Sequence, residues 1–221
     1  MEDVLELYAE PHDPARPVVC FDEASKELRG DVAGPIPPAP GSPAKQDYEY
    51  TRHGTANLFV VVEPLAGRRH IAVTDRRTIP DFAARMKHLC DEMYPEAEVI
   101  RVVLDNLNTH KIGSLFSTYP PEEAWRLARR LEFHFTPKHA SWLNMAECEL
   151  SVLSRQCLGR RLASREVVAA EVEAWEAGRN RAGVKLTWSF RVADARRKLA
   201  HLYPYSSSRQ TTSVLSRKSV I

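Results

Sequence analysis

The apolar residues of this chain recur with two different periods, and the short period predicts strands. Residues 16–23 hold a brief run of β-branched and aromatic residues that ends in acid, which is typical of a short strand. Residues 57–75 predict two strands joined by a turn over 64–67, where a proline and a glycine interrupt the apolar run. Residues 98–105 and 131–137 predict two more strands. The first of these is almost continuously apolar, as expected of a central strand covered on both faces.

Apolar positions three and four residues apart predict helices, namely over 79–95, 120–131, 143–162 and 165–182. Pro95 ends the first of them, and prolines followed by acids begin the second. Gly159 closes the third. The stretch from Pro35 to Pro43 holds five prolines, which remove hydrogen-bond donors and therefore predict an extended loop.

The predicted order is strand, hairpin, helix, strand, helix, strand, helix, helix. Three early strands followed by alternation predict an α/β fold, with a mixed five-stranded sheet flanked by helices and a C-terminal helical extension. We expect four segments: a lead segment over 1–15, a core over 16–162, a helical extension over 163–204 and a disordered tail over 205–221. The tail is polar and rich in serine and threonine.

The composition, 43 % hydrophobic and 27 % charged, is that of an ordinary globular protein. No run approaches the roughly 18 apolar residues of a membrane span. The acidic start, MEDVLELYAEPHDP, lacks the basic flank and apolar stretch of a signal peptide, so we expect a cytoplasmic protein. The four cysteines show no metal-ligand spacing and are expected to be free thiols.

The net charge of +2 hides an asymmetry along the chain. Residues 151–221 contain 14 Lys or Arg and 5 Asp or Glu, which gives +9, and residues 1–150 contain 17 and 24, which gives −7. A basic C-terminal third indicates either a surface that binds a polyanion or a solvated basic helical face. Charge alone leaves both alternatives open.

Two acids, Asp22 and Asp105, each follow an apolar strand. If those strands are parallel neighbours, the carboxylates emerge side by side and repel each other unless a cation lies between them. Oxygen ligands suit Mg²⁺ or Mn²⁺, and a third carboxylate would allow two ions to act roughly 3.5–4 Å apart. The alternatives are an Asx turn made by Asp105 with Asn106, and replacement of Asp22 by Glu23 as the ligand.

The third acid is sought in the predicted helix over 143–162. Glu147 and Glu149 flank its apolar stripe on opposite sides, so periodicity does not choose between them. Asn144 and Glu147 also have the spacing of a capping box, in which Asn144 begins the helix and Glu147 reaches back to it. A helix cap and a metal ligand therefore both remain possible for Glu147.

Three segments, VCFDE, VLDNLNTH and TPKHASWLNMAECELSVLSRQ, together resemble the catalytic domain of DDE transposases, in particular the bacterial insertion-sequence branch of the mariner superfamily. Asp105, Asn106 and His110 match that family's Asp-Asn-x-x-x-His signature. Leu143, Asn144 and Glu147 match its Leu-Asn-x-x-Glu signature, with 147 − 105 − 1 = 41 residues between the two acids. Residues 186–204 also resemble the family's closing segment, so the resemblance covers roughly residues 1 to 204.

The resemblance implies a ribonuclease-H-like fold, with the hairpin strands on one side of the first strand and the Asp105 strand on the other. It implies that Asp22, Asp105 and Glu147 bind two Mg²⁺ ions, with Mn²⁺ as a substitute. The implied activity is DNA strand cleavage followed by strand transfer at insertion-sequence ends. The implied partners are double-stranded DNA, both element ends and target, and a second copy of the chain.

The same resemblance implies supporting roles for Asn106, Asn144 and His110; His110 would orient a phosphate or the attacking water, or else be a hydrogen-bonded turn residue. Basic residues are expected to contact DNA phosphates, or else to be merely solvated: Lys138, His139, Arg155, Arg160, Arg161, Arg196, Arg197 and Lys198. Trp142, Trp175 and Trp188 are expected in the core rather than stacked on bases.

One feature departs from the family. Complete members carry an N-terminal helix-turn-helix module that recognises element ends, whereas Asp22 lies too early for one to precede it. We therefore expect recognition to need a separately encoded helix-turn-helix protein, in a nucleoid-associated setting. The competing hypotheses are a ribonuclease-H-type nuclease and an inactive or partner-dependent remnant that only binds DNA.

Overall fold

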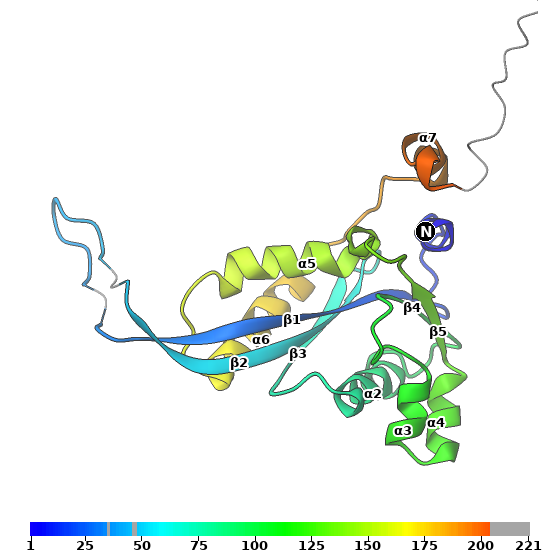
Figure 1. The fold of residues 1–221 in the computed structure, drawn as a ribbon, viewed down its shortest axis with the longest axis horizontal. Helices are drawn as coiled ribbons and strands as arrows, with labels where there is room; N and C mark the ends of the chain where they lie inside the picture. Colours follow the sequence, from blue (N-terminus) through cyan, green and yellow to red (C-terminus); the bar gives the residue numbers. More distant parts are fainter. Residues whose placement is uncertain (35, 46–47, 204–221) are drawn as a thin grey trace, which may run out of the picture.

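Five strands form the sheet of this protein, whose structure is a computed structural model describing residues 1–203 except 35, 46 and 47 (Figure 1). The predicted tail over 205–221 lies outside the described residues. The strands are β1 (Val18–Asp31), β2 (Tyr50–Glu63), β3 (Arg68–Thr74), β4 (Ile100–Leu104) and β5 (Leu131–Phe135). Their order across the sheet is β3-β2-β1-β4-β5.

Both pairing directions occur in this sheet. β1, β2 and β3 are antiparallel neighbours, whereas β1, β4 and β5 run parallel. The hairpin strands thus lie on one side of β1 and the strand that ends before Asp105 lies on the other. This confirms the predicted mixed sheet. β4 is buried along its whole length, as its continuous apolar sequence predicts.

β1 is much longer than the predicted strand over 16–23, and Asp22 lies inside it rather than at its end. The reason is the partner on its antiparallel side, because β2 stays paired with β1 from Cys20 opposite Val62 to Asp31 opposite Tyr50. The two strands form an arm that projects from the body in Figure 1. Its proline-rich tip contains isolated bridges between Ile36 and Lys45 and between Ala39 and Ser42.

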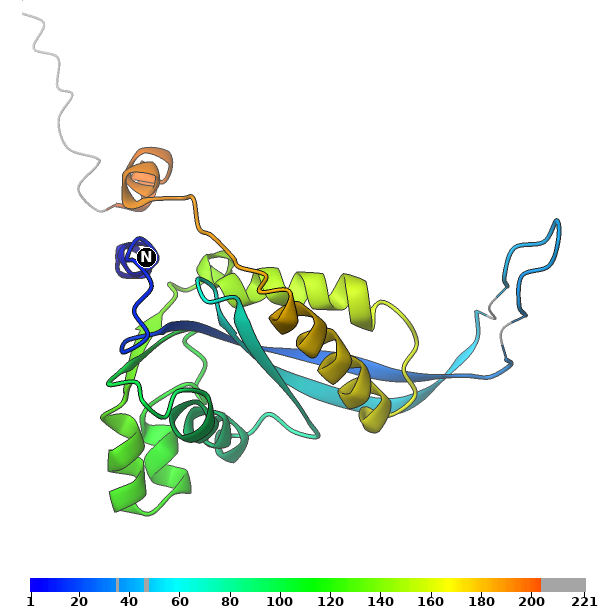
Figure 2. The same cartoon turned by 180° about the vertical axis from the view of Figure 1, so that it is seen from behind.

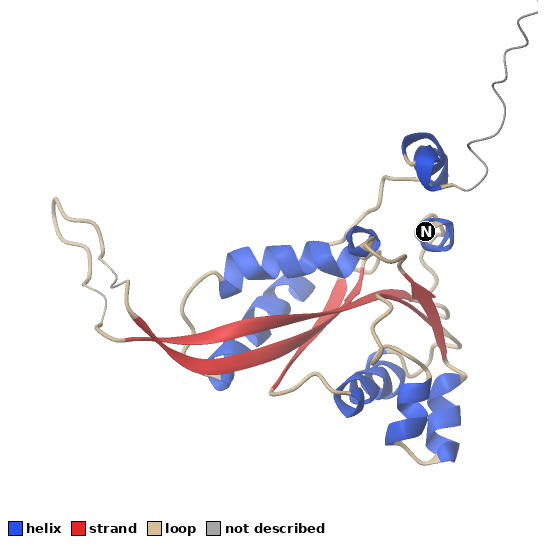
Figure 3. Ribbon diagram, in the orientation of Figure 1, coloured by secondary structure: helices blue, strands red, loops and turns tan. Residues whose placement is uncertain are grey.

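Helices cover both faces of the sheet (Figures 2 and 3). One face packs against α2 (Ile79–His88), the π-helical turn Leu89–Met93, α3 (Gly113–Thr118) and α4 (Pro121–Ala128). The other packs against α5 (Met145–Leu153), which continues as the π-helical turn Ser154–Leu158, and α6 (Arg165–Arg181). The sheet is therefore the middle layer of three, as the apolar character of its central strands requires.

Three short helices were not predicted from periodicity: α1 (Glu2–Leu7), α3 (Gly113–Thr118) and α7 (Val192–Lys198). Each spans less than two turns, too short for a repeating apolar pattern to emerge. Each buries only a few side chains, among them Leu5 of α1 and Ala195 of α7, which share a small core with Leu143. Short 3₁₀ turns, Ser141–Leu143 and Ala200–Leu202, complete the described structure. No helix among the described residues is both long and apolar enough to cross a membrane.

An ion pair fastens α1 to α7. Arg196 donates two hydrogen bonds, both 2.7 Å long, to the two carboxylate oxygens of Glu2, and the Tyr203 hydroxyl donates a third at 2.8 Å. The hydrogen bonds from Arg196, and then from Tyr203, lower the pKa of Glu2 to about 2. The bidentate geometry makes this contact more specific than an ordinary surface ion pair.

We expect the α1–α7 contact to weaken in acid. Because the pKa of Glu2 is lower in the folded chain than its ordinary value of 4.5, its stabilisation is complete above pH 4.5 and is lost as the pH falls towards 2. Thermal unfolding of the parent and of Arg196→Gln should therefore differ near pH 6, and the difference should be much smaller at about pH 2.5. Melting curves that differ equally at both pH values would contradict this assignment.

Candidate active site

Asp22 and Asp105 lie side by side on the two central parallel strands. β1 and β4 pair in parallel from Val18 opposite Arg101 to Cys20 opposite Val103. Continuing that register by two residues brings Asp22 level with Asp105, which directly follows β4. Asp22 is thus the position where β1 loses its parallel neighbour, although β1 itself continues. Asp22 and Asp105 are therefore adjacent because the pairing between β1 and β4 ends there, and not because both strands end there.

His110 lies behind this pair and joins it to a third acid. The His110 ring is completely buried, with Nδ1 2.5 Å from Oδ1 of Asp105 and Nε2 2.9 Å from Oε1 of Glu23. The rings of Phe21 and Phe82 enclose it, with centroids 5.3 and 4.9 Å away. Burial lowers the pKa of His110, but the hydrogen bonds to Asp105 and Glu23 outweigh it and raise that pKa to about 9.

Asn144 connects the start of α5 to the same point of β1. Its Oδ1 accepts a hydrogen bond of 3.1 Å from the backbone N–H of Ala146, which makes it the N-cap of α5. Its Nδ2 donates to the carbonyl oxygen of Phe21 at 2.8 Å and lies 3.4 Å from Oδ2 of Asp22. One buried amide thereby fixes the first turn of α5, and with it Glu147, beside Asp22.

The structure distinguishes the two acids of α5 that periodicity could not. Glu149 is completely buried, with Oε1 2.8 Å from Nε of Arg69 and 2.7 Å from Nε of Arg179. Arg69 is itself buried and also donates to the carbonyl oxygen of Val184 at 2.6 Å. Glu147 instead exposes its side chain, one helical turn from the N-cap. Only Glu147 is therefore accessible to an ion or to DNA.

The charges of the three candidate acids act on one another. Burial, and then the negative charges of Glu147 and Asp105, raise the pKa of Asp22 to about 7, although the backbone N–H of Glu23 opposes this by donating to it. A partly buried carboxylate beside two others stays ionised at neutral pH only if positive charge is supplied. A divalent cation that takes oxygen ligands would supply it.

The donor set fits such an ion, although the side chains do not enclose one as they stand. Within the described residues, no three histidine, cysteine or acidic side chains are grouped so as to hold a metal. Asp22 and Asp105 form the adjacent pair, and Glu147 is the exposed and rotatable third group. Glu23 is occupied by His110, with only 5 % of its side chain exposed, so it is a poor substitute for Asp22. Asn106 is exposed at the start of the following loop.

The basic residues predicted to contact DNA fall into two groups. Several are engaged with acids of the chain itself: Arg160 with Glu171, Arg161 with Asp31, Arg196 with Glu2 and Arg197 with Asp194. Lys198 lies over the ring of Phe190. Lys138 and His139 are exposed in the turn before α5, and Arg155 is exposed on the α5 side, where it donates to the Ser151 hydroxyl at 2.6 Å. The second group lies on the same side of the sheet as Glu147.

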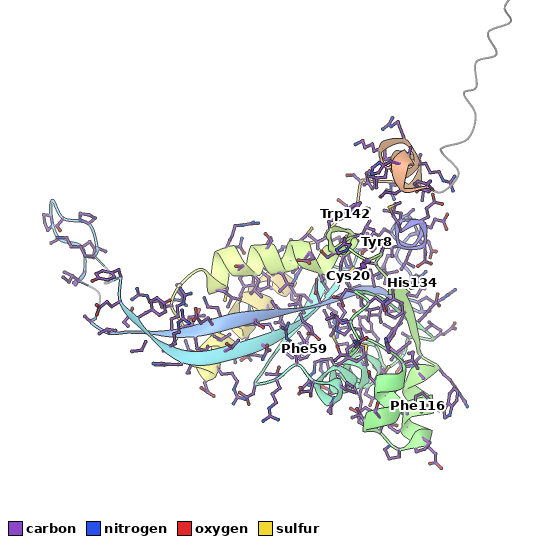
Figure 4. All side chains as sticks on the ribbon, in the orientation of Figure 1. Tyr8, Cys20, Phe59, Phe116, His134 and Trp142 are labelled. Atoms are coloured by element: carbon purple, nitrogen blue, oxygen red, sulfur yellow. The ribbon has the colours of Figure 1, made fainter. Side chains whose placement is uncertain are left out.

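Sequence reasoning missed the local role of Trp142. We expected all three of Trp142, Trp175 and Trp188 in the core, but Trp142, labelled in Figure 4, is 45 % exposed. It lines an open hollow that Glu147 also lines. No local pattern separates Trp142 from its neighbour Leu143, which is fully buried.

A model of the DDE superfamily endonuclease family matches residues 17–168, which is more than half of the chain. The matched segment contains Asp22, Asp105 and Glu147. No curated protein matches the sequence. The family match therefore rests on the same segment that forms the sheet and the candidate site.

Solved structures match the fold at low sequence identity. The Mos1 strand transfer complex has a TM-score of 0.53 at 14 % identity, over 77 % of this chain and 51 % of that chain. The Mos1 transposase paired-end complex with left transposon end has 0.53 at 14 %, over 77 % and 52 %. A pre-cleavage Mos1 transpososome has 0.51 at 13 %, over 77 % and 52 %. The chain spans about half the length of these Mos1 chains and shares their ribonuclease-H-like fold. By the match over residues 17–168, it belongs to the DDE superfamily endonucleases.

Proposed function

We propose that this chain is a transposase catalytic domain that cleaves DNA strands with divalent metal ions and joins the freed end to target DNA. The observation that carries the proposal is the placement of three acids: Asp22 and Asp105 are level on the neighbouring parallel strands β1 and β4, and Glu147 lies in the first turn of α5, whose N-cap Asn144 contacts β1 at Phe21 and Asp22. The matching structures include a Mos1 strand transfer complex and a Mos1 transposase paired-end complex with left transposon end, which supports DNA as the substrate.

Asp22, Asp105 and Glu147 would hold two Mg²⁺ ions, for which Mn²⁺ could substitute. Bound ions of this kind lower the pKa of a water and stabilise a departing oxygen during in-line displacement at phosphorus. His110 is a positioning residue in this scheme, because it is buried against the Phe21 ring and holds the Asp105 carboxylate through its Nδ1. No protein nucleophile is required, since water and then the freed 3′ hydroxyl attack the phosphodiester.

Lys138, His139 and Arg155 are the basic residues best placed to contact the DNA backbone, since they are exposed and Arg155 lines the same hollow as Glu147. Arg160, Arg161, Arg196 and Arg197 would have to exchange an internal carboxylate for a phosphate. We propose that the chain acts as a homodimer on paired DNA ends, and that a helix-turn-helix module supplies sequence recognition. Its setting would be the bacterial cytoplasm, at the nucleoid.

Nicking of supercoiled plasmid tests the proposal directly. The purified full chain should convert supercoiled plasmid to the open circular form with Mn²⁺ or Mg²⁺, and excess chelator should stop the reaction. A linear substrate bearing a 3′ hydroxyl should in addition become joined to plasmid. Joining distinguishes a transposase from a ribonuclease-H-type nuclease, which only hydrolyses.

An inert parent chain would count against autonomous activity and favour the partner-dependent or remnant hypothesis. Plasmid binding without nicking, measured by gel shift, would identify that case. Cleavage that persists in excess chelator would contradict the metal-dependent mechanism altogether.

A further inference from the structure

The surface next to Glu147 forms a hollow of about 560 Å³ at the start of α5. Trp142 and Ser141 line one end of it, and Ser151 and Arg155 line the other. Its volume lies within the range of roughly 300–1,000 Å³ that small organic ligands occupy in proteins. The hollow is thus large enough for a nucleoside and shares a wall with the candidate active site.

The indole of Trp142 is held rigidly from behind. Trp188 stacks on it, with ring centroids 6.2 Å apart and planes inclined by 21°, and Phe190 meets it edge-on at 5.7 Å. Both supporting rings come from the segment between α6 and α7. Although these two rings pack against it, 45 % of the surface of Trp142 stays exposed, and Trp142 lines the hollow. A fixed, half-exposed aromatic face is a stacking platform.

The charge around the platform fits a nucleotide. Arg155 lies in the hollow, and the partner that its guanidinium contacts among the described residues is the neutral Ser151 hydroxyl. Arg155 is therefore available to bind a phosphate, and Glu147, a candidate metal ligand, lines the same hollow. An aromatic plane flanked by a cation is the combination on which single-stranded nucleic acid stacks.

We propose that Trp142 forms the floor of a subsite that stacks one unpaired nucleobase of the DNA strand held at the carboxylates. The proposal rests on the proposed function insofar as DNA is the ligand. A base in the middle of a duplex is covered on both faces by its neighbours, so the subsite selects bases at frayed, overhanging or flipped positions. Trp142 is thus a specificity residue for strand ends and distorted junctions.

Fluorescence binding with 2-aminopurine tests this subsite. One probe carries the base at the first unpaired position of a duplex with a 3′ overhang, and the control probe is a blunt duplex with the base paired. Binding is measured in the presence of chelator, so that it does not depend on cleavage. The parent is compared with Asp105→Asn, which reduces the negative charge of the site. The expected result is tighter binding of the overhang probe, with quenching of its fluorescence.

Trp142→Ala should weaken binding of the overhang probe about tenfold and abolish the quenching, with little change for the blunt duplex. Trp142→Phe keeps a ring and should stay within about threefold of the parent. Trp125→Ala is the matched control, because Trp125 is 56 % exposed but lies on α4, on the opposite face of the sheet. Equal melting temperatures would show that the variants are folded.

The proposal is overturned if Trp142→Ala binds the overhang probe as tightly as the parent, if it loses both probes equally, or if the parent does not prefer the overhang. A parent that prefers the overhang through Trp142 but never nicks plasmid would leave the subsite standing and remove the proposed activity. If the parent instead nicks plasmid but does not prefer the overhang probe, the proposed activity stands and the subsite is rejected.

Discussion

Asp105→Asn should lower the rate of metal-dependent plasmid nicking by roughly 10³-fold or more, because it removes a charged oxygen ligand from the pair that would hold the ions. Asn keeps the size of the side chain and still accepts a hydrogen bond from His110, whose Nδ1 lies 2.5 Å from Oδ1 of Asp105. The fold should therefore persist. Initial rates at saturating Mn²⁺, together with melting temperatures, measure both effects.

Asp22→Asn and Glu147→Gln should cause losses of the same order, since each removes one acid of the same site. Their combined effect should be far smaller than the product of the single effects, because the three act as a unit. Glu173→Gln is the matched control, as Glu173 is an exposed acid on α6. If Glu147→Gln cut plasmid as fast as Glu173→Gln, Glu147 would not be a ligand.

Glu149→Gln should lower the free energy of unfolding by about 3–5 kcal/mol, although only one residue separates it from Glu147 in the sequence. The substitution leaves the buried Arg69 guanidinium without its compensating charge, in a place where water cannot replace it. Arg179, with 16 % of its side chain exposed, can turn partly towards solvent. Urea unfolding of the two neighbouring variants, Glu147→Gln and Glu149→Gln, measures the difference.

Glu147→Gln should stay within about 0.5 kcal/mol of the parent, as expected for an exposed side chain. The double variant Arg69→Met with Glu149→Leu should recover much of the loss, because apolar groups of similar size avoid the desolvation of the charges. A loss below about 1 kcal/mol for Glu149→Gln would mean that the ion pair contributes little beyond its packing.

The sheet could be predicted from the sequence because most of its strands are themselves runs of β-branched and other apolar residues. The β-branched runs of β2 and β4 are buried, as their patterns predict. Asp105, the acid after β4, lies level with Asp22 of β1, as expected when these two strands are parallel neighbours. The length of β1 was not predictable in the same way. Residues 24–31 have little apolar character of their own, and they are extended because β2 pairs with them across the sheet.

The site could be predicted only in part, because charge partners are set by tertiary structure. The sequence suggested Asp22, Asp105 and one acid of α5, but Glu149 is distinguished from Glu147 by arginines 80 and 30 residues away from it, at positions 69 and 179. Likewise, nothing near Arg161 in the sequence indicates that it pairs with Asp31, and nothing near Glu23 indicates that it meets His110.

The contact between α1 and α7 has a consequence for the order of folding during synthesis. The Leu5 side chain is almost fully buried against Leu143 and Ala195, and Ala195 is among the last residues of the body that the ribosome adds. At about 5–20 residues per second, α1 waits roughly 10–40 s before this final partner emerges. Val4 and Leu7 pack against the sheet and α5, which are made earlier, so the Leu5 side of α1 is the part left uncovered in that interval. Docking of the first helix is therefore completed only at the last stage of assembly.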